Sequence, residues 1–142
     1  MDLYRFAAYA HLIIAILSMG MALFWLIMLV ALRQKFPREE ADRWLTAANQ
    51  ARWPHVVVPW RFRLPLPWIS WGLIAALVAT GVLIGRVHGV PSGTAWTVKL
   101  ALVAAIAVVQ LPMTRRPTAP FIHAGFWITL AAIVVSGICV RG

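Results

Sequence analysis

The sequence predicts an all-α, polytopic integral membrane protein in which four helices form one bundle. Three observations lead to this fold class: 62% of the residues are hydrophobic, the few charged residues fall between four long apolar runs, and each run is long enough to cross a bilayer. A helix needs about 20 apolar residues to span ~30 Å of hydrocarbon. Backbone at that depth must satisfy its own hydrogen bonds, so the runs must be helical.

The spans are expected at residues 6–32, 64–85, 95–113 and 119–140, within a single transmembrane domain that covers residues 1–142. No charge interrupts the first two runs. The third contains Lys99 near its start, and the fourth contains His123 as its candidate titratable side chain. The first run is too long for the apolar core of a signal peptide and no small-x-small cleavage site follows it, so we interpret it as a membrane helix.

The loop at residues 33–63 is predicted to be cytoplasmic and amphipathic. Its first part, residues 37–42, is polar and acidic, whereas residues 44–60 mix tryptophans with apolar and basic residues, a pattern typical of a segment at the membrane interface. Prolines at 54, 59, 65 and 67 exclude one continuous helix from this loop into the second span. We expect this loop to anchor the chain at the membrane surface and to set the topology of the spans.

Basic residues predict the orientation, because short cytoplasmic loops retain Lys and Arg. Nine of them fall in loops 33–63 and 114–118, which we therefore place in the cytoplasm, with both termini outside the inner membrane. They are Arg33, Lys35, Arg38, Arg43, Arg52, Arg61, Arg63, Arg115 and Arg116, against Arg5, Arg86 and Arg141 on the other side. The net charge of +9 is explained by this distribution and by anionic lipid, so no nucleic-acid partner is expected.

Several classes of chemistry lack support in the sequence. Cys139 is the only cysteine, so one chain offers neither a disulfide nor a thiolate cluster. No carboxylate lies within a span to orient a histidine for hydrolysis, and no glycine-rich nucleotide motif is present. No catalytic residue can be named, and whether the protein is an enzyme stays open.

His11 is the strongest candidate ligand, because polar groups inside a membrane are costly and are often functional. At helical spacings of −4, +4, +7 and +11 it is flanked by the small residues Ala7, Ala15, Ser18 and Ala22. This smooth strip leaves room for a flat group such as a tetrapyrrole whose iron takes a histidine ligand. Small residues equally allow close packing between helices, with the histidine bonded across the contact.

Lys99 is the second candidate, and it shares one helical face with Trp96 and Gln110. We expect Lys99 at a similar depth to His11, where its ammonium could meet an anionic group such as a haem propionate. It could instead extend to the membrane surface. Arg86 and His88, just beyond the second span, add polar groups on the same side.

A second ligand cluster is possible on the cytoplasmic side. It would consist of His123 together with His55, Arg61 and Arg63, and would allow one haem in each leaflet. Bulky Pro120, Phe126 and Trp127 flank His123, however, in place of the small residues beside His11.

The segments AHLIIAILSMG, LVATGVLIG and WTVKLALVAAIAVVQL resemble the superfamily of copper-resistance CopD domains and HemJ-type protoporphyrinogen oxidases. His11, Gly20, Trp96 and Lys99 match its outline. The resemblance implies a haem b or porphyrin site built on His11 and Lys99. Ser18 stands where the family commonly has tryptophan, and Gln110 where HemJ-type proteins carry a late histidine, so porphyrinogen oxidation does not follow.

Two other functions remain open from the residues alone. Met19 and Met21 offer thioethers suited to Cu(I), but alternate residues point about 200° apart on a helix. The chain could also be a noncatalytic subunit of a larger membrane complex or form a homo-oligomer, because small residues recur at helical spacings. These are Gly72, Ala76 and Thr80, then Gly81 and Gly85, and then Ala101 and Ala105.

Overall fold

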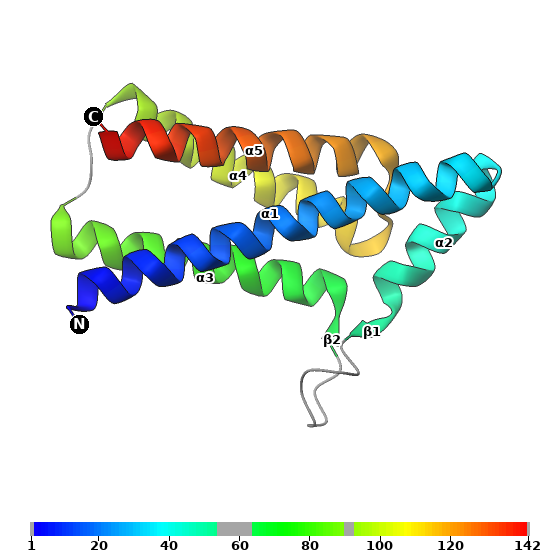
Figure 1. Ribbon diagram of the computed structural model, residues 1–142, viewed down its shortest axis with the longest axis horizontal. Helices are drawn as coiled ribbons and strands as arrows, with labels where there is room; N and C mark the ends of the chain where they lie inside the picture. Colours follow the sequence, from blue (N-terminus) through cyan, green and yellow to red (C-terminus); the bar gives the residue numbers. More distant parts are fainter. Residues whose placement is uncertain (1, 54–63, 90–92, 142) are drawn as a thin grey trace.

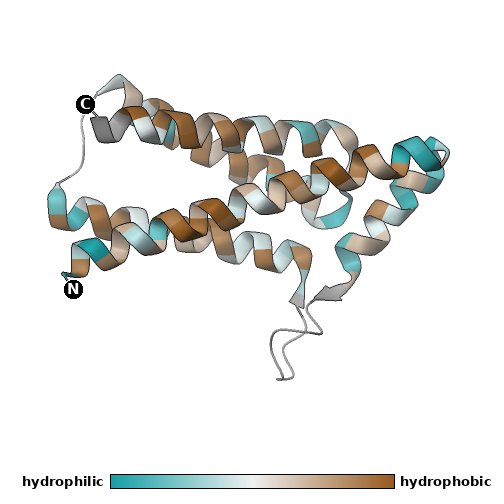
Figure 2. Cartoon of the chain, in the orientation of Figure 1, coloured by the Kyte–Doolittle hydropathy of each residue, from teal (hydrophilic) through white to brown (hydrophobic). Residues whose placement is uncertain are grey.

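The computed structural model describes residues 2–53, 64–89 and 93–141, and it confirms an all-α bundle (Figure 1). Four helices are long and apolar enough to cross a membrane: α1 (Leu3–Lys35), α3 (Leu66–His88), α4 (Thr94–Arg115) and α5 (Ala119–Arg141). Their residues are largely hydrophobic (Figure 2), and many of their large apolar side chains are exposed, such as Val108 of α4 at 64%. Such a surface is unfavourable in water and fits a lipid bilayer.

Most helix ends lie a few residues beyond the predicted spans, but α3 begins at Leu66, later than the expected start at residue 64. Helix α1 begins at Leu3 and continues to Lys35, because basic residues at its end can lie outside the hydrocarbon and the helix stops only before Pro37. Helix α3 begins at Leu66, with Pro67 in the first turn, where the missing amide hydrogen is tolerated. It ends before Gly89, whose φ of +85° suits glycine.

The predicted cytoplasmic loop contains a regular helix, α2 (Arg38–Gln50), and two short paired strands, β1 (Arg52–Trp53) and β2 (Leu64–Pro65). Helix α2 buries three residues at a spacing of four, namely Ala41, Leu45 and Asn49, and exposes charged residues on its other face. The predicted interfacial segment therefore starts as an amphipathic helix, while its residues 54–60 lie outside the described residues.

The spanning helices form a ring in the order α1, α3, α4, α5. The pairs α1–α3, α1–α5 and α4–α5 pack extensively, whereas α3 contacts α4 over a much smaller area. The tightly packed core lies at the end of the bundle near α2, and away from the end where α1 begins and α5 ends (Figure 1). It consists of Trp25, Leu29, Leu45, Leu66, Met113, Ala119 and Ile122.

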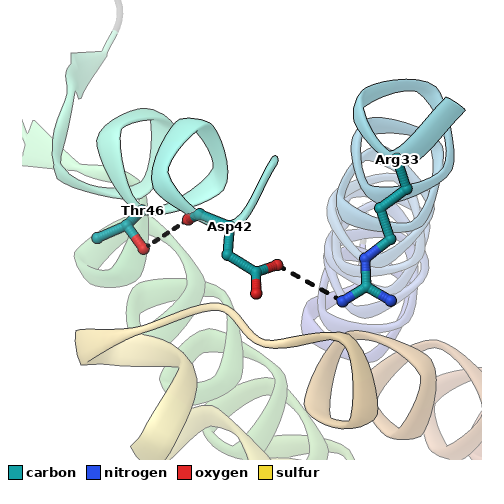
Figure 3. Close-up of polar contacts among 3 residues, drawn as sticks. All are labelled: Arg33, Asp42 and Thr46. Atoms are coloured by element: carbon teal, nitrogen blue, oxygen red, sulfur yellow. Dashed lines mark hydrogen bonds and ion pairs between the residues drawn. The ribbon is translucent and has the colours of Figure 1, made fainter. Parts of the chain in front are cut away.

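Helix α2 is tied to this packed end by polar contacts. The Asn49 side chain, 2% exposed, donates hydrogen bonds to the carbonyl oxygens of Met113 (3.0 Å) and Thr114 (3.4 Å). These carbonyls belong to the last turn of α4 and lack partners within the helix. Figure 3 shows a second tie, in which Arg33 of α1 lies 3.5 Å from the carboxylate of Asp42. The Thr46 hydroxyl donates to the Asp42 backbone carbonyl (2.9 Å).

Replacing Asn49 with alanine is expected to destabilise the fold by about 1–3 kcal/mol, because two buried carbonyls then lose their donor. The free energy of unfolding in mild detergent measures this change. Gln50→Ala, on the exposed neighbouring position, is the matched control and should change stability little. Equal effects of the two substitutions would show that the Asn49 cap contributes nothing specific.

Candidate functional site

A large cavity of about 480 Å³ lies within the loosely packed end of the bundle, and all four spanning helices line it. We call it the outer cavity because it lies farther from the packed core than the smaller cavity described below. Its volume falls within the ~300–1,000 Å³ of typical ligand sites. The lining is mostly apolar, and several positions carry small side chains, which leaves the space open: Ala15, Gly81, Gly85, Ala132 and Ser136. The cavity lies where α3 and α4 separate, since that helix pair packs least.

His11 lies in the wall of the outer cavity and joins α1 to α3. Its Nδ1 atom is 2.7 Å from the Thr80 hydroxyl oxygen. The same oxygen lies 2.8 Å from the carbonyl oxygen of Ala76 and 3.2 Å from that of Leu77. Thr80 therefore connects the imidazole to the backbone of its own helix.

The tautomer of His11 sets the direction of this hydrogen bond. With the proton on Nδ1, the imidazole donates to Thr80, and Thr80 donates its single hydroxyl proton to the Ala76 carbonyl, which only accepts. In this tautomer the other ring nitrogen, Nε2, keeps its lone pair. Histidine ligands of metals are commonly oriented in this way by a partner on the opposite nitrogen.

Gly81 keeps space beside the imidazole. A Cβ atom added at Gly81 would lie 3.6 Å from the His11 Cε1 atom, which is the ring carbon between the two nitrogens. Alanine would therefore make ordinary van der Waals contact, whereas a longer side chain would occupy the space next to the ring. The small residue at position 81 thus leaves the histidine accessible from the cavity.

The outer cavity carries positive charge. Lys99 and Arg86 both line it, and the Lys99 ammonium lies 5.3 Å from the centre of the Trp96 ring, which also lines the cavity. The aromatic face attracts the cation and holds it near the cavity. Among the residues that the structure describes, no Asp or Glu lines this space. An anionic group on a ligand would therefore find two cations without a competing carboxylate.

The structure thus brings together four of the six predicted site residues: His11, Arg86, Trp96 and Lys99. His88 is exposed at the end of α3, where its ring stacks on Tyr4 with centroids 3.9 Å apart. His123 is exposed in the first turns of α5 and lines neither this cavity nor the smaller one described next. Its predicted companions His55, Arg61 and Arg63 lie outside the described residues.

A smaller cavity of about 70 Å³, the inner cavity, lies between the outer cavity and the packed core. Gln110 lines it, so this residue of the predicted polar face also points away from lipid. Met21 and Met113 also line it. Met19 lines neither cavity, as expected because alternate residues of a helix point in different directions. Within the described ranges there is no cluster of three or more His, Cys, Asp or Glu that could hold a metal.

Two residues of the site were not predicted to interact with His11. Thr80 and Gly81 stand out in the sequence only as small residues at helical spacings. Their role depends on which face of α3 packs against α1 and at what height, and neither follows from the α3 sequence alone. A threonine within an apolar span is the one available signal, because its hydroxyl needs a partner.

Comparison with known proteins finds no matching family model, no similar characterised protein and no similar solved structure.

Proposed function

We propose that the protein is a small haem-associated redox protein whose outer cavity binds haem b, with His11 as axial ligand and Lys99 and Arg86 as partners of the propionates. The observation that carries this proposal is the arrangement of His11. The Nδ1 atom lies 2.7 Å from the Thr80 hydroxyl oxygen, and the ring borders an apolar cavity whose cations are Lys99 and Arg86. In the tautomer that donates from Nδ1 to Thr80, the Nε2 atom keeps its lone pair for a metal.

The residues present fit a haem in three respects. The cavity is apolar and large enough for a cofactor, as its volume of about 480 Å³ indicates. It offers a histidine nitrogen, a usual ligand of haem iron. Its lining also contains two cations, Lys99 and Arg86, and no acidic residue among the described lining residues, which suits two carboxylates. The resemblance to CopD and HemJ-type proteins in the segments around His11 and Lys99 points the same way.

Bound haem would supply one-electron redox chemistry, while the chain would determine its position and surroundings. His11 would hold the iron from one side, and Thr80 would keep the imidazole oriented. Lys99, held over Trp96, would neutralise a propionate. Apolar residues of all four helices would exclude water from most of the macrocycle.

The membrane placement is part of the proposal. Nine basic residues, seven within residues 33–63 and two at residues 115–116, support a cytoplasmic position for that end of the bundle. The outer cavity then opens on the outside of a bacterial-type inner membrane. Electrons could reach it from a partner in the membrane or from the outer side.

The test is the absorption spectrum of the protein extracted in mild detergent, recorded oxidised and after dithionite reduction, with haem quantified per chain. A reduced b-type spectrum at close to one haem per chain is expected. A colourless protein purified from haem-replete cells would contradict the proposal. If that colourless protein also co-purified with defined subunits, the role as an accessory subunit would replace it.

Replacing Thr80 with valine is expected to lower haem affinity about 10- to 100-fold, because the imidazole loses the acceptor that orients it. Thr80→Ser retains the hydroxyl and should restore affinity. Haem titration of the purified apoprotein, followed by the Soret band, measures the difference. Thr97→Val, at an exposed position of α4, is the control for loss of a threonine hydroxyl. Equal haem affinity of Thr80→Val and the wild-type protein would exclude Thr80 as the orienting residue.

Replacing Gly81 with leucine is expected to block the haem site while leaving the fold intact, since the longer side chain enters the space beside His11. Gly81→Ala should bind nearly normally, because its Cβ makes only ordinary contact. The control is Gly72→Leu on the same helix, where an added Cβ meets no atom within 4 Å. Haem content per folded chain decides the outcome, and full haem in Gly81→Leu would place the ligand elsewhere.

A further inference from the structure

The inner cavity has the properties of a water-filled chamber. Its volume of about 70 Å³ exceeds the ~10–15 Å³ that one water molecule requires. Four polar side chains line it, one from each spanning helix: Ser18 of α1, Ser70 of α3, Gln110 of α4 and Thr129 of α5. An internal water needs two to four polar partners, and this cavity supplies them.

Two of these polar groups lack protein partners. In the part of the chain that the structure describes, neither the Gln110 carboxamide nor the Ser70 hydroxyl makes a hydrogen bond, although Ser70 is only 9% exposed. Leaving such groups unsatisfied inside a membrane protein is costly. Water in the chamber would satisfy both.

The chamber adjoins the outer cavity. Ser18, Ile106 and Thr129 line both spaces and therefore form the boundary between them. The hydroxyls of Ser18 and Thr129 donate to carbonyls of their own helices, at 2.8 and 2.7 Å, so their oxygens remain available as acceptors. Water can thus be bonded on either side of this boundary.

Toward α2 the polar groups are fixed in hydrogen bonds within the protein. The Gln110 backbone carbonyl accepts from the Thr114 hydroxyl (2.8 Å), which in turn accepts from the Trp71 indole N–H (2.9 Å). Beside them, the buried Asn49 amide donates to the Met113 and Thr114 carbonyls. Carbonyls, an indole N–H and a carboxamide do not relay protons, so protons in the chamber exchange on the side of the outer cavity.

We infer that the inner cavity holds water bonded to Ser70 and Gln110, and that the Ser18 and Thr129 hydroxyls pass protons between this water and the outer cavity. This exchange does not depend on which ligand the outer cavity binds. If haem binds there, the water supplies or takes up the protons that accompany a change of charge in the cavity.

The test introduces a carboxyl group into the chamber and follows its exchange by infrared spectroscopy. All four natural acidic residues lie outside the apolar spans, so Gln110→Glu creates one distinct membrane-embedded carboxyl. In proteoliposomes mixed with D₂O, its protonated C=O band is expected to shift within the mixing time and to disappear as pD rises. The control is Val108→Glu, at a highly exposed, lipid-facing position two residues away, whose band should stay protonated. Identical behaviour of the two variants would overturn the inference.

A second variant keeps the test valid if Gln110→Glu fails to fold. Gln110→Cys in a Cys139→Ala background is treated with Ag⁺, which replaces the thiol proton to give a silver thiolate and H⁺. Ag⁺ should modify the thiol introduced at position 110, as detected by mass spectrometry, and should leave the Val108→Cys control unmodified. Failure of the thiol at position 110 to react would overturn the inference. Neither experiment requires haem, so its outcome is independent of the proposed function.

Discussion

His11→Ala is expected to lose its haem, leaving a folded protein with background absorbance in the Soret region. The imidazole is the proposed axial ligand, and the structure places no second histidine among the described residues that line the outer cavity. Without the ligand, only apolar contacts and the two cations would hold the macrocycle. Haem per chain, compared with the wild-type protein purified in parallel, measures the effect.

Chemical rescue separates ligand loss from misfolding. His11→Gly leaves a gap the size of the side chain beside Thr80 and Gly81, which free imidazole can occupy. Adding imidazole during haem titration is expected to restore a b-type spectrum to His11→Gly, and to change the Thr80→Val spectrum less. The control is His88→Gln, which removes an exposed ring that packs against Tyr4. This variant should keep its haem. Full haem content in His11→Ala would reject the ligand assignment.

Lys99→Glu is expected to have the second-largest effect, lowering haem affinity by more than tenfold. The substitution replaces an ammonium next to the propionates with a carboxylate, so that a favourable charge pair becomes a repulsion between like charges. Lys99→Met, which removes the charge without reversing it, should have an intermediate effect, while Lys99→Arg should be close to wild type. The affinity series, measured by haem titration, should therefore follow charge at this position.

Salt and thermal stability serve as controls for the Lys99 series. A charge effect at a partly exposed site should weaken as ionic strength rises. Unfolding of the haem-free variants should be similar, because the Lys99 ammonium packs over the Trp96 ring and makes no hydrogen bond or ion pair within the described residues. Equal haem affinities for Lys99→Glu and Lys99→Arg would show that Lys99 does not face the ligand.

The spans could be predicted from the sequence because lipid imposes a simple rule on it. Charges between long apolar runs and the need for internal hydrogen bonds identify α1, α3, α4 and α5 to within a few residues. Helix α2 was less predictable. The mixture of tryptophans with apolar and basic residues at 44–60 suggested an interfacial segment of a loop. The helix depends on tertiary contacts, in particular the burial of Leu45 in the bundle core and of Asn49 against the last turn of α4.

The candidate site was predictable in its residues more than in its shape. The small residues near His11 indicated free space, and the structure places Ala15 and Ser18 at the outer cavity and Ala22 at the inner one. The cavity itself depends on how far α3 separates from α4, which is a property of packing between helices that no single helix sequence encodes. For the same reason Thr80 could not be assigned to His11, nor Ser70 to Gln110.

A variant with His11 as its only histidine tests the central claim most directly. His55, His88 and His123 are replaced together by glutamine, and the purified apoprotein in lipid nanodiscs is titrated with haem. We predict saturation at one haem per chain, with the affinity and the reduced b-type spectrum of the wild-type protein. Loss of haem binding from this variant, while a variant that lacks only His11 retained it, would show that another histidine holds the iron and that the outer cavity has a different ligand.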